Sequence, residues 1–224
     1  MWGNKRTDEG ILMDFNLLAK LLEYPKDDFK DLLIKFESSL DEVNPEFKNQ
    51  FSKFSIPVKE SSIDELQELY VKTFELNSIC TPYVGVHIFG EDGFKRGNFM
   101  ARLKQAFKDN NLEIGTELPD HISLILKLAS SLKDENKFNA LLSECIINPT
   151  NLMLNEFGCD IKNGDLDDDA SAAQYWNSAS LGMTNRQKIN TVNEVKDNSN
   201  PYQHLLLTIK TIAESSLTKE PNNA

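Results

Sequence analysis

The chain has little glycine, proline or cysteine for its length. Its 224 residues include 10 glycines, 8 prolines and 3 cysteines. So few turn-forming residues argue against a turn-dense all-β sandwich and against low-complexity sequence. The cysteines, Cys80, Cys145 and Cys159, are widely spaced and form neither a disulfide framework nor a zinc signature. We expect three reduced thiols, at least one of them in the core.

Long apolar runs are also missing. No run of about 18 apolar residues occurs, so the sequence predicts no membrane-spanning helix. Near the N-terminus, Asp14 and Lys20 interrupt the apolar stretch that begins at Ile11. This pattern is not that of a secretory signal peptide. We therefore expect a cytoplasmic protein without direct membrane insertion.

Basic residues are outnumbered by acidic ones. The chain has 24 Lys and Arg against 35 Asp and Glu, which gives a formal net charge of −11. A surface with this balance repels phosphates, which weighs against a nucleic-acid-binding protein.

Sequence motifs of catalysis are absent as well. The three histidines, His87, His121 and His204, form no His-Glu-x-x-His pair, and no Gly-x-Ser-x-Gly occurs. The segment Gly90-Glu-Asp-Gly93 lacks the Lys-Ser/Thr that follows in a phosphate-binding loop. These patterns identify no catalytic residue, no cofactor and no metal-ligand set.

What the chain does have is a helical repeat of apolar residues. Phe15, Leu18, Ala19 and Leu22 are spaced at i, i+3, i+4 and i+7, and similar stripes recur along the sequence. No segment shows the alternation of a β-strand. We predict an all-α fold: a single-domain helical bundle of roughly seven to nine helices that spans residues 1–224.

The stripes and helix caps also predict where the elements lie. Ser62 and Glu65 form a capping-box pattern, Pro119 is expected at the first helical position of its helix, and Asn200-Pro201 should begin the last helix. We expect a short helix or irregular link at 44–61 and a long loop at 75–93. Residues 160–200 are expected to be a loosely ordered acidic and polar segment, with a short helix at 170–181.

Three blocks in a fixed order go beyond composition. They are Tyr70-Val-Lys-Thr-Phe74, Gly90-Glu-Asp-Gly-Phe-Lys-Arg96-Gly97, and Glu117-Leu-Pro-Asp120-His121. In this order they resemble the signature of the molybdoenzyme assembly chaperones of the NarJ/TorD/DmsD family. The resemblance covers about residues 20–215, and the chain is most similar to the nitrate reductase cofactor-assembly branch.

The resemblance implies a function as well as a fold. It implies an all-helical, cytoplasmic protein that is not an enzyme and acts as a monomer or weak dimer. The implied partner is the catalytic subunit of a molybdenum oxidoreductase, such as nitrate reductase, with its N-terminal twin-arginine signal-like segment. The chaperone would hold that subunit until the cofactor is inserted, before export or membrane docking.

Within that hypothesis, six residues are candidates for peptide binding. We expect a groove between the helix at 63–74, the helix at 95–108 and the start of the helix at 119–132. Tyr70 and Phe74 are candidate wall residues, Glu117 and Asp120 are candidate partners of peptide arginines, and His121 is a candidate hydrogen-bonding group. Arg96 is a further candidate, with the alternative that it holds the loop by pairing with an acid such as Glu91 or Asp92. A net charge of −11 favours a cationic peptide as partner.

Two other functions stay open at this point. Glu117 and His121 are four residues apart and are candidate metal ligands of a helical metal-dependent hydrolase, although catalytic zinc takes three protein ligands. The other alternative is a generic helical scaffold. For each candidate residue, helix capping or core packing is an equally simple explanation.

Overall fold

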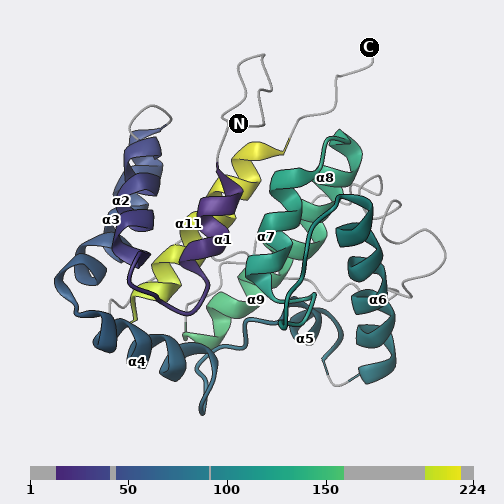
Figure 1. Cartoon of the computed structure of the whole chain (residues 1–224), viewed down its shortest axis with the longest axis horizontal. Coiled ribbons are helices and arrows are strands. Elements are labelled where there is room, and N and C mark those ends of the chain that lie inside the picture. The colour runs from purple at the N-terminus through teal and green to yellow at the C-terminus, as the bar shows by residue number, and fades with distance from the viewer. Residues whose placement is uncertain (1–13, 41–43, 91, 159–199, 218–224) are drawn as a thin grey trace.

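The computed structural model describes residues 14–40, 44–90, 92–158 and 200–217 (Figure 1). In these ranges the chain is helical, and it contains no β-strand. The elements are α1 (Phe15–Leu21), α2 (Phe29–Leu40), α3 (Pro45–Glu60), α4 (Ile63–Phe74), α5 (Val84–Phe89), α6 (Gly93–Asp109), α7 (Ile122–Ser131), α8 (Glu135–Leu141), the π-helical turn η1 (Leu142–Ile147), α9 (Asn148–Glu156) and α11 (Pro201–Ser216).

Three of these elements form one continuous helix. α8, η1 and α9 follow one another without a break from Glu135 to Glu156. Counted this way, the described residues form nine helical stretches: α1 to α7, the continuous helix, and α11. The all-α prediction of roughly seven to nine helices is confirmed.

The helix α11 forms the centre of the molecule. It packs against α3, η1 and α9, and in Figure 1 it lies (yellow) between the α2–α3 pair and the helices α7 and α9. All residues from Tyr202 to Lys210 are buried, so this helix is enclosed on every side over its first half. A helix that is enclosed in this way is a core element rather than a surface amphipathic helix.

The start of α11 is joined to α4 by a buried hydrogen bond. The Asn200 side chain accepts from the backbone N–H of Tyr202 (3.0 Å) and donates through Nδ2 to Thr73 Oγ1 (2.8 Å). Around it the rings of Tyr70, Phe74 and Tyr202 are in contact, with centroids 4.9–6.0 Å apart. The N-cap at Asn200, predicted from the Asn-Pro pair, is confirmed, and it also fixes the register of two distant helices.

The prediction for residues 44–61 is wrong. The segment is one 16-residue helix, α3, rather than a short helix or an irregular link. Its buried residues Phe47, Phe51, Phe54 and Val58 follow the helical period and contact α2 and α11. Pro57 lies inside this helix and removes one N–H from its hydrogen-bond ladder, but only three residues of the helix follow it.

Two boundaries near the candidate site also differ from expectation. α7 begins at Ile122 with His121 as its N-cap, so Pro119 and Asp120 precede the helix instead of opening it. The segment 75–93 is not all loop, because α5 lies within it.

Other predictions of local structure are confirmed. Ser62 and Glu65 form the capping box of α4, and Cys80 and Cys145 are buried free thiols. Cys159, the acidic segment 160–200 up to residue 199, and the helix expected at 170–181 lie outside the described residues. Among the described helices, none has both the length and the apolar run needed to cross a bilayer.

Two Asn-Pro helix starts permit a matched stability test. Asn44 caps α3 through a single hydrogen bond to Glu46 N, whereas Asn200 caps α11 and also donates to Thr73. Asn44→Ala should lower the free energy of unfolding by about 1 kcal/mol, the usual value of an N-cap. Asn200→Ala should lower it by about 2–4 kcal/mol, because a buried hydrogen bond is lost as well. Urea unfolding measures both values, and equal losses would contradict the inferred role of Asn200.

Candidate functional site

Two segments far apart in sequence pair beside the start of α7. The backbone N–H of Val84 donates to the carbonyl of Asp120 (2.8 Å), and that of Ile122 donates to the carbonyl of Pro82 (2.9 Å). Tyr83 and His121 therefore lie opposite each other in an isolated antiparallel bridge. We call residues 82–85 and 117–121 together the strap. It fixes the start of α5 to the start of α7.

An ion pair lies directly against the strap. Arg96, in the first turns of α6, donates from Nε to Asp120 Oδ2 (2.8 Å) and from Nη2 to Oδ1 (3.3 Å). The Asp120 side chain is fully buried, and that of Arg96 is 23% exposed. A two-pronged guanidinium–carboxylate pair of this kind offsets the cost of burying the carboxylate. It joins α6 to the segment that leads into α7.

Gly85 provides the space for this pair. A Cβ atom at position 85 would lie 2.5 Å from Asp120 Oδ2 and 2.9 Å from Arg96 Cγ. Both distances are shorter than any ordinary carbon contact. Asp120 and Arg96 are held by their two mutual hydrogen bonds, so neither can easily move away from an added methyl group. The position therefore requires glycine because of this close approach.

Tyr83 connects the ion pair to the surface. The Arg96 guanidinium lies over its ring, 5.4 Å from the centroid, and the ring meets His121 edge-on at 5.5 Å. Its hydroxyl donates to Glu117 Oε1 (3.0 Å). Partial burial and the Glu117 carboxylate raise the pKa of Tyr83 to about 12, so this hydroxyl stays a neutral donor.

Glu117 is the exposed acid of the strap. Its Oε1 accepts from the Tyr83 hydroxyl and from the backbone N–H of Leu118 (2.8 Å). These two donors orient the carboxylate while the side chain stays exposed. Leu118 beside it is 42% exposed, and Phe94 in the first turn of α6 is 80% exposed. An oriented acid and exposed apolar groups thus occur on the segments that the ion pair fixes.

His121 is buried and caps α7. Its Nδ1 accepts from the backbone N–H of Ser123 (3.2 Å), so a neutral ring carries its proton on Nε2. Burial lowers the pKa of His121, and the negative charges of Glu117, Glu23 and Asp120 oppose that shift. The ring is therefore a neutral structural group in the folded protein.

Tyr70 and Phe74 lie in the core. Both side chains are 5% exposed, and both pack on Tyr202 at the start of α11. Burial raises the pKa of Tyr70 well above its usual value. They belong to the aromatic cluster between α4 and the start of α11.

The structure thus brings four of the six candidate residues together. Arg96, Glu117, Asp120 and His121 are linked through Tyr83, whereas Tyr70 and Phe74 belong to the core cluster. Arg96 pairs with Asp120; Asp92 instead caps α6 and pairs with Lys95, and Glu91 lies outside the described residues. Sequence reasoning missed Tyr83 and Gly85 as site residues. One sequence signal could have indicated them: the helix-breaking residues Pro82 and Gly85 lie on either side of Tyr83, in a segment where the helical repeat of apolar residues stops.

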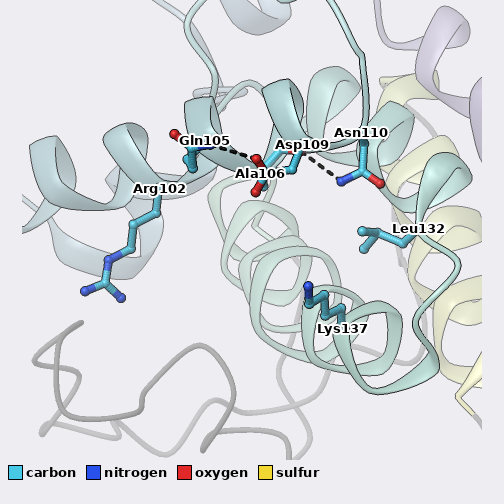
Figure 2. A pocket seen from close by; sticks show the side chains of 7 residues that line it. All are labelled: Arg102, Gln105, Ala106, Asp109, Asn110, Leu132 and Lys137. Atoms are coloured by element: carbon cyan, nitrogen blue, oxygen red, sulfur yellow. Dashed lines mark hydrogen bonds between the residues drawn. The ribbon is translucent and has the colours of Figure 1, made fainter.

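A cavity of about 290 Å³ lies elsewhere. Figure 2 shows it between the second half of α6 and the junction of α7 with α8. Its lining includes none of the six candidate residues; the lining residues are Arg102, Gln105, Ala106, Asp109, Asn110, Leu132 and Lys137. This cavity therefore does not coincide with the groove expected between the helices at 63–74, 95–108 and 119–132.

Glu117 and His121 do not gather a third metal ligand among the described residues. In that part of the chain, the one group of three or more potential ligands is Cys80, His87 and Glu156. Glu117 is engaged with Tyr83, and Nδ1 of His121 with Ser123. This geometry does not favour a hydrolase centred on Glu117 and His121.

Comparison with known proteins gives one family. A family model described as the nitrate reductase delta subunit matches residues 35–154, which are 120 of the 224 residues and more than half of the chain. The match confirms the family resemblance found in the sequence. It contains all six candidate residues as well as Tyr83 and Gly85, and it ends before α11. A search of curated proteins found no match.

The close approach at Gly85 yields a prediction with a built-in control. Gly85→Ala should lower the free energy of unfolding by about 3–5 kcal/mol, because the new methyl group displaces one partner of a buried ion pair. Gly97→Ala makes the same change in α6, where nothing lies within 4 Å of the added atom. It should be stabilising by about 0.5–1 kcal/mol, since alanine favours a helix interior. Denaturant unfolding compares the two, and similar effects would contradict the role of Gly85.

The burial of His121 predicts a pH dependence of stability. In the unfolded chain a histidine takes up a proton near pH 6.5, but in the folded protein the lowered pKa resists protonation. The unfolded state therefore binds more protons, and stability falls as pH drops below about 6.5. His204, whose pKa burial lowers to about 4, acts in the same direction.

His121→Asn isolates this contribution. Asparagine keeps an N-cap acceptor for α7 but does not titrate. Free energies of unfolding measured between pH 7 and pH 5 should fall less steeply for the variant than for the parent protein. An identical slope would show that His121 does not contribute.

Proposed function

The chain belongs to the nitrate reductase delta subunit family, and we propose on that premise that it is a cytoplasmic assembly chaperone and not an enzyme. Its partner is the catalytic subunit of a molybdenum oxidoreductase, nitrate reductase or a relative. It binds the N-terminal signal-like segment of that subunit. It holds the subunit until the cofactor is inserted, before export or membrane docking. The family match over residues 35–154 is the observation that carries this proposal.

The arrangement of the strap supports peptide binding near Glu117. A twin-arginine segment presents a basic region followed by an apolar one. Glu117 offers an exposed carboxylate already oriented by Tyr83 and Leu118, and Leu118 and Phe94 offer exposed apolar side chains. A preoriented acid loses less side-chain freedom when it meets an arginine, which favours binding.

The other candidate residues support this surface from within. Asp120 is fully buried and engaged with Arg96, so in this proposal the pair positions the strap and His121 positions the start of α7. Tyr70 and Phe74, on α4, pack on Tyr202 at the start of α11 and so help to fix α4 in the core. The net charge of −11 attracts the cationic segment before contact and so favours fast association.

Charge reversal at the surface tests the peptide site. Glu117→Lys should weaken binding of a twin-arginine peptide by about tenfold or more, because it replaces attraction with repulsion at the contact. Glu113→Lys, an exposed acid in the same α6–α7 connection, makes the same change in net charge and should have a much smaller effect. Fluorescence anisotropy with a labelled peptide, at low and high salt, measures both.

The possible outcomes test the peptide site and the chaperone function separately. Equal weakening by both variants would reject Glu117 as a contact while leaving the chaperone role intact. If the full-length protein captures neither the catalytic subunit of nitrate reductase nor that of a related molybdoenzyme on co-expression, the proposed function itself fails.

A further inference from the structure

Three potential metal ligands converge away from the peptide site. Cys80 follows α4, His87 lies in α5 and Glu156 is the last residue of α9. One ligand atom from each, a sulfur, a ring nitrogen and a carboxylate oxygen, lie within 4.8 Å of one another. No sequence motif predicts this set, because Glu156 lies far along the chain from the other two residues.

The backbone holds the three residues in place. The N–H of Cys80 donates to the carbonyl of Thr73 in α4 (3.0 Å). The N–H of Thr81 donates to Glu156 Oε2 (3.3 Å), and α5 packs against α9. These hydrogen bonds and the packing of α5 on α9 keep the three residues close together.

His87 has the orientation of a metal ligand. Its Nε2 lies 2.8 Å from the carbonyl oxygen of Thr81, and since a carbonyl only accepts, Nε2 carries the hydrogen. In the neutral ring Nδ1 then bears the lone pair, and it faces Glu156 Oε1 at 3.7 Å. Metal-binding histidines commonly donate their other N–H to a backbone carbonyl in this way.

The distance between the His87 and Glu156 donor atoms fits a tetrahedral ion. Zinc bonds of about 2.0–2.3 Å place neighbouring donors roughly 3.3–3.8 Å apart, which includes the 3.7 Å between His87 and Glu156. That distance is too long for a hydrogen bond. Cys80 and the His87 side chain are almost fully buried, whereas Glu156 is 41% exposed, so the cluster opens to solvent on the Glu156 side.

We propose that Cys80, His87 and Glu156 bind one divalent cation of the zinc class, with water or a donor from a partner in the fourth position. Binding converts the Cys80 thiol to a thiolate, and its proton passes to solvent. The ion would tie the Cys80 loop and α5, which carries Gly85 of the strap, to the end of α9. This site is independent of the proposed chaperone function.

Cobalt binding tests the proposal, because a cobalt–thiolate bond gives a charge-transfer band and tetrahedral cobalt gives strong visible bands. The protein is the full chain carrying Cys159→Ser, freed of metal with a chelator. We expect one equivalent of cobalt to bind with both signals and to be displaced by zinc. Zinc should also raise the midpoint of thermal unfolding, since it binds the folded state.

Single substitutions assign the ligands. Cys80→Ser should abolish the charge-transfer band, and Glu156→Gln should weaken cobalt binding by tenfold or more. Glutamine keeps a side-chain oxygen that can accept from the Thr81 N–H, so this substitution should leave the fold intact. Glu75→Gln, an exposed acid in the Cys80 loop, is the matched control and should bind cobalt like the parent.

Three results would overturn the proposal. They are no charge-transfer band in the parent protein, a band that survives Cys80→Ser, and equal affinity in the Glu156→Gln and Glu75→Gln variants.

Discussion

The buried ion pair between Arg96 and Asp120 is the interaction on which the site depends. It joins α6 to the segment before α7, and the backbone of that segment in turn holds the start of α5. A buried carboxylate is tolerated only with a partner of good geometry, so Gly85 must leave room and Arg96 must approach from the side of Tyr83. One electrostatic requirement therefore constrains the positions of three helices and the identity of one glycine.

The same pair divides the site into a buried layer and an exposed layer. Arg96, Asp120 and His121 are engaged with groups inside the protein, whereas Glu117 and Leu118 face solvent. Binding surfaces are more selective when their contact groups are held by a rigid layer beneath them. Here Tyr83, which lies against Arg96, helps to hold the exposed carboxylate of Glu117 in one orientation.

Much of the fold could be predicted from the sequence, because helix stripes and caps are local signals. Ser62, Asn200 and the apolar repeats gave correct helices, whereas three phenylalanines in α3 were misread because two prolines flank or interrupt their stripe. The site was less predictable. Asp120 was expected at a peptide contact. Nothing in the local sequence shows that it is buried in an ion pair with Arg96, 24 residues earlier. The requirement for glycine at position 85 and the proximity of Cys80 to Glu156 arise only from tertiary packing. The spacing of residues in the sequence does not reveal either of them.

The position of α11 has a consequence for how the protein is made. Its first residues bond to α4 across 127 positions of sequence, and it fills the space between α3, η1 and α9. A ribosome releases those helices before their central one, so their apolar faces stay open to water until residues 200–216 have been synthesised. Contacts between such distant segments also form slowly. The nascent chain therefore depends on its last described helix to cover the apolar faces of the earlier ones, and it is exposed to aggregation until that helix has been made.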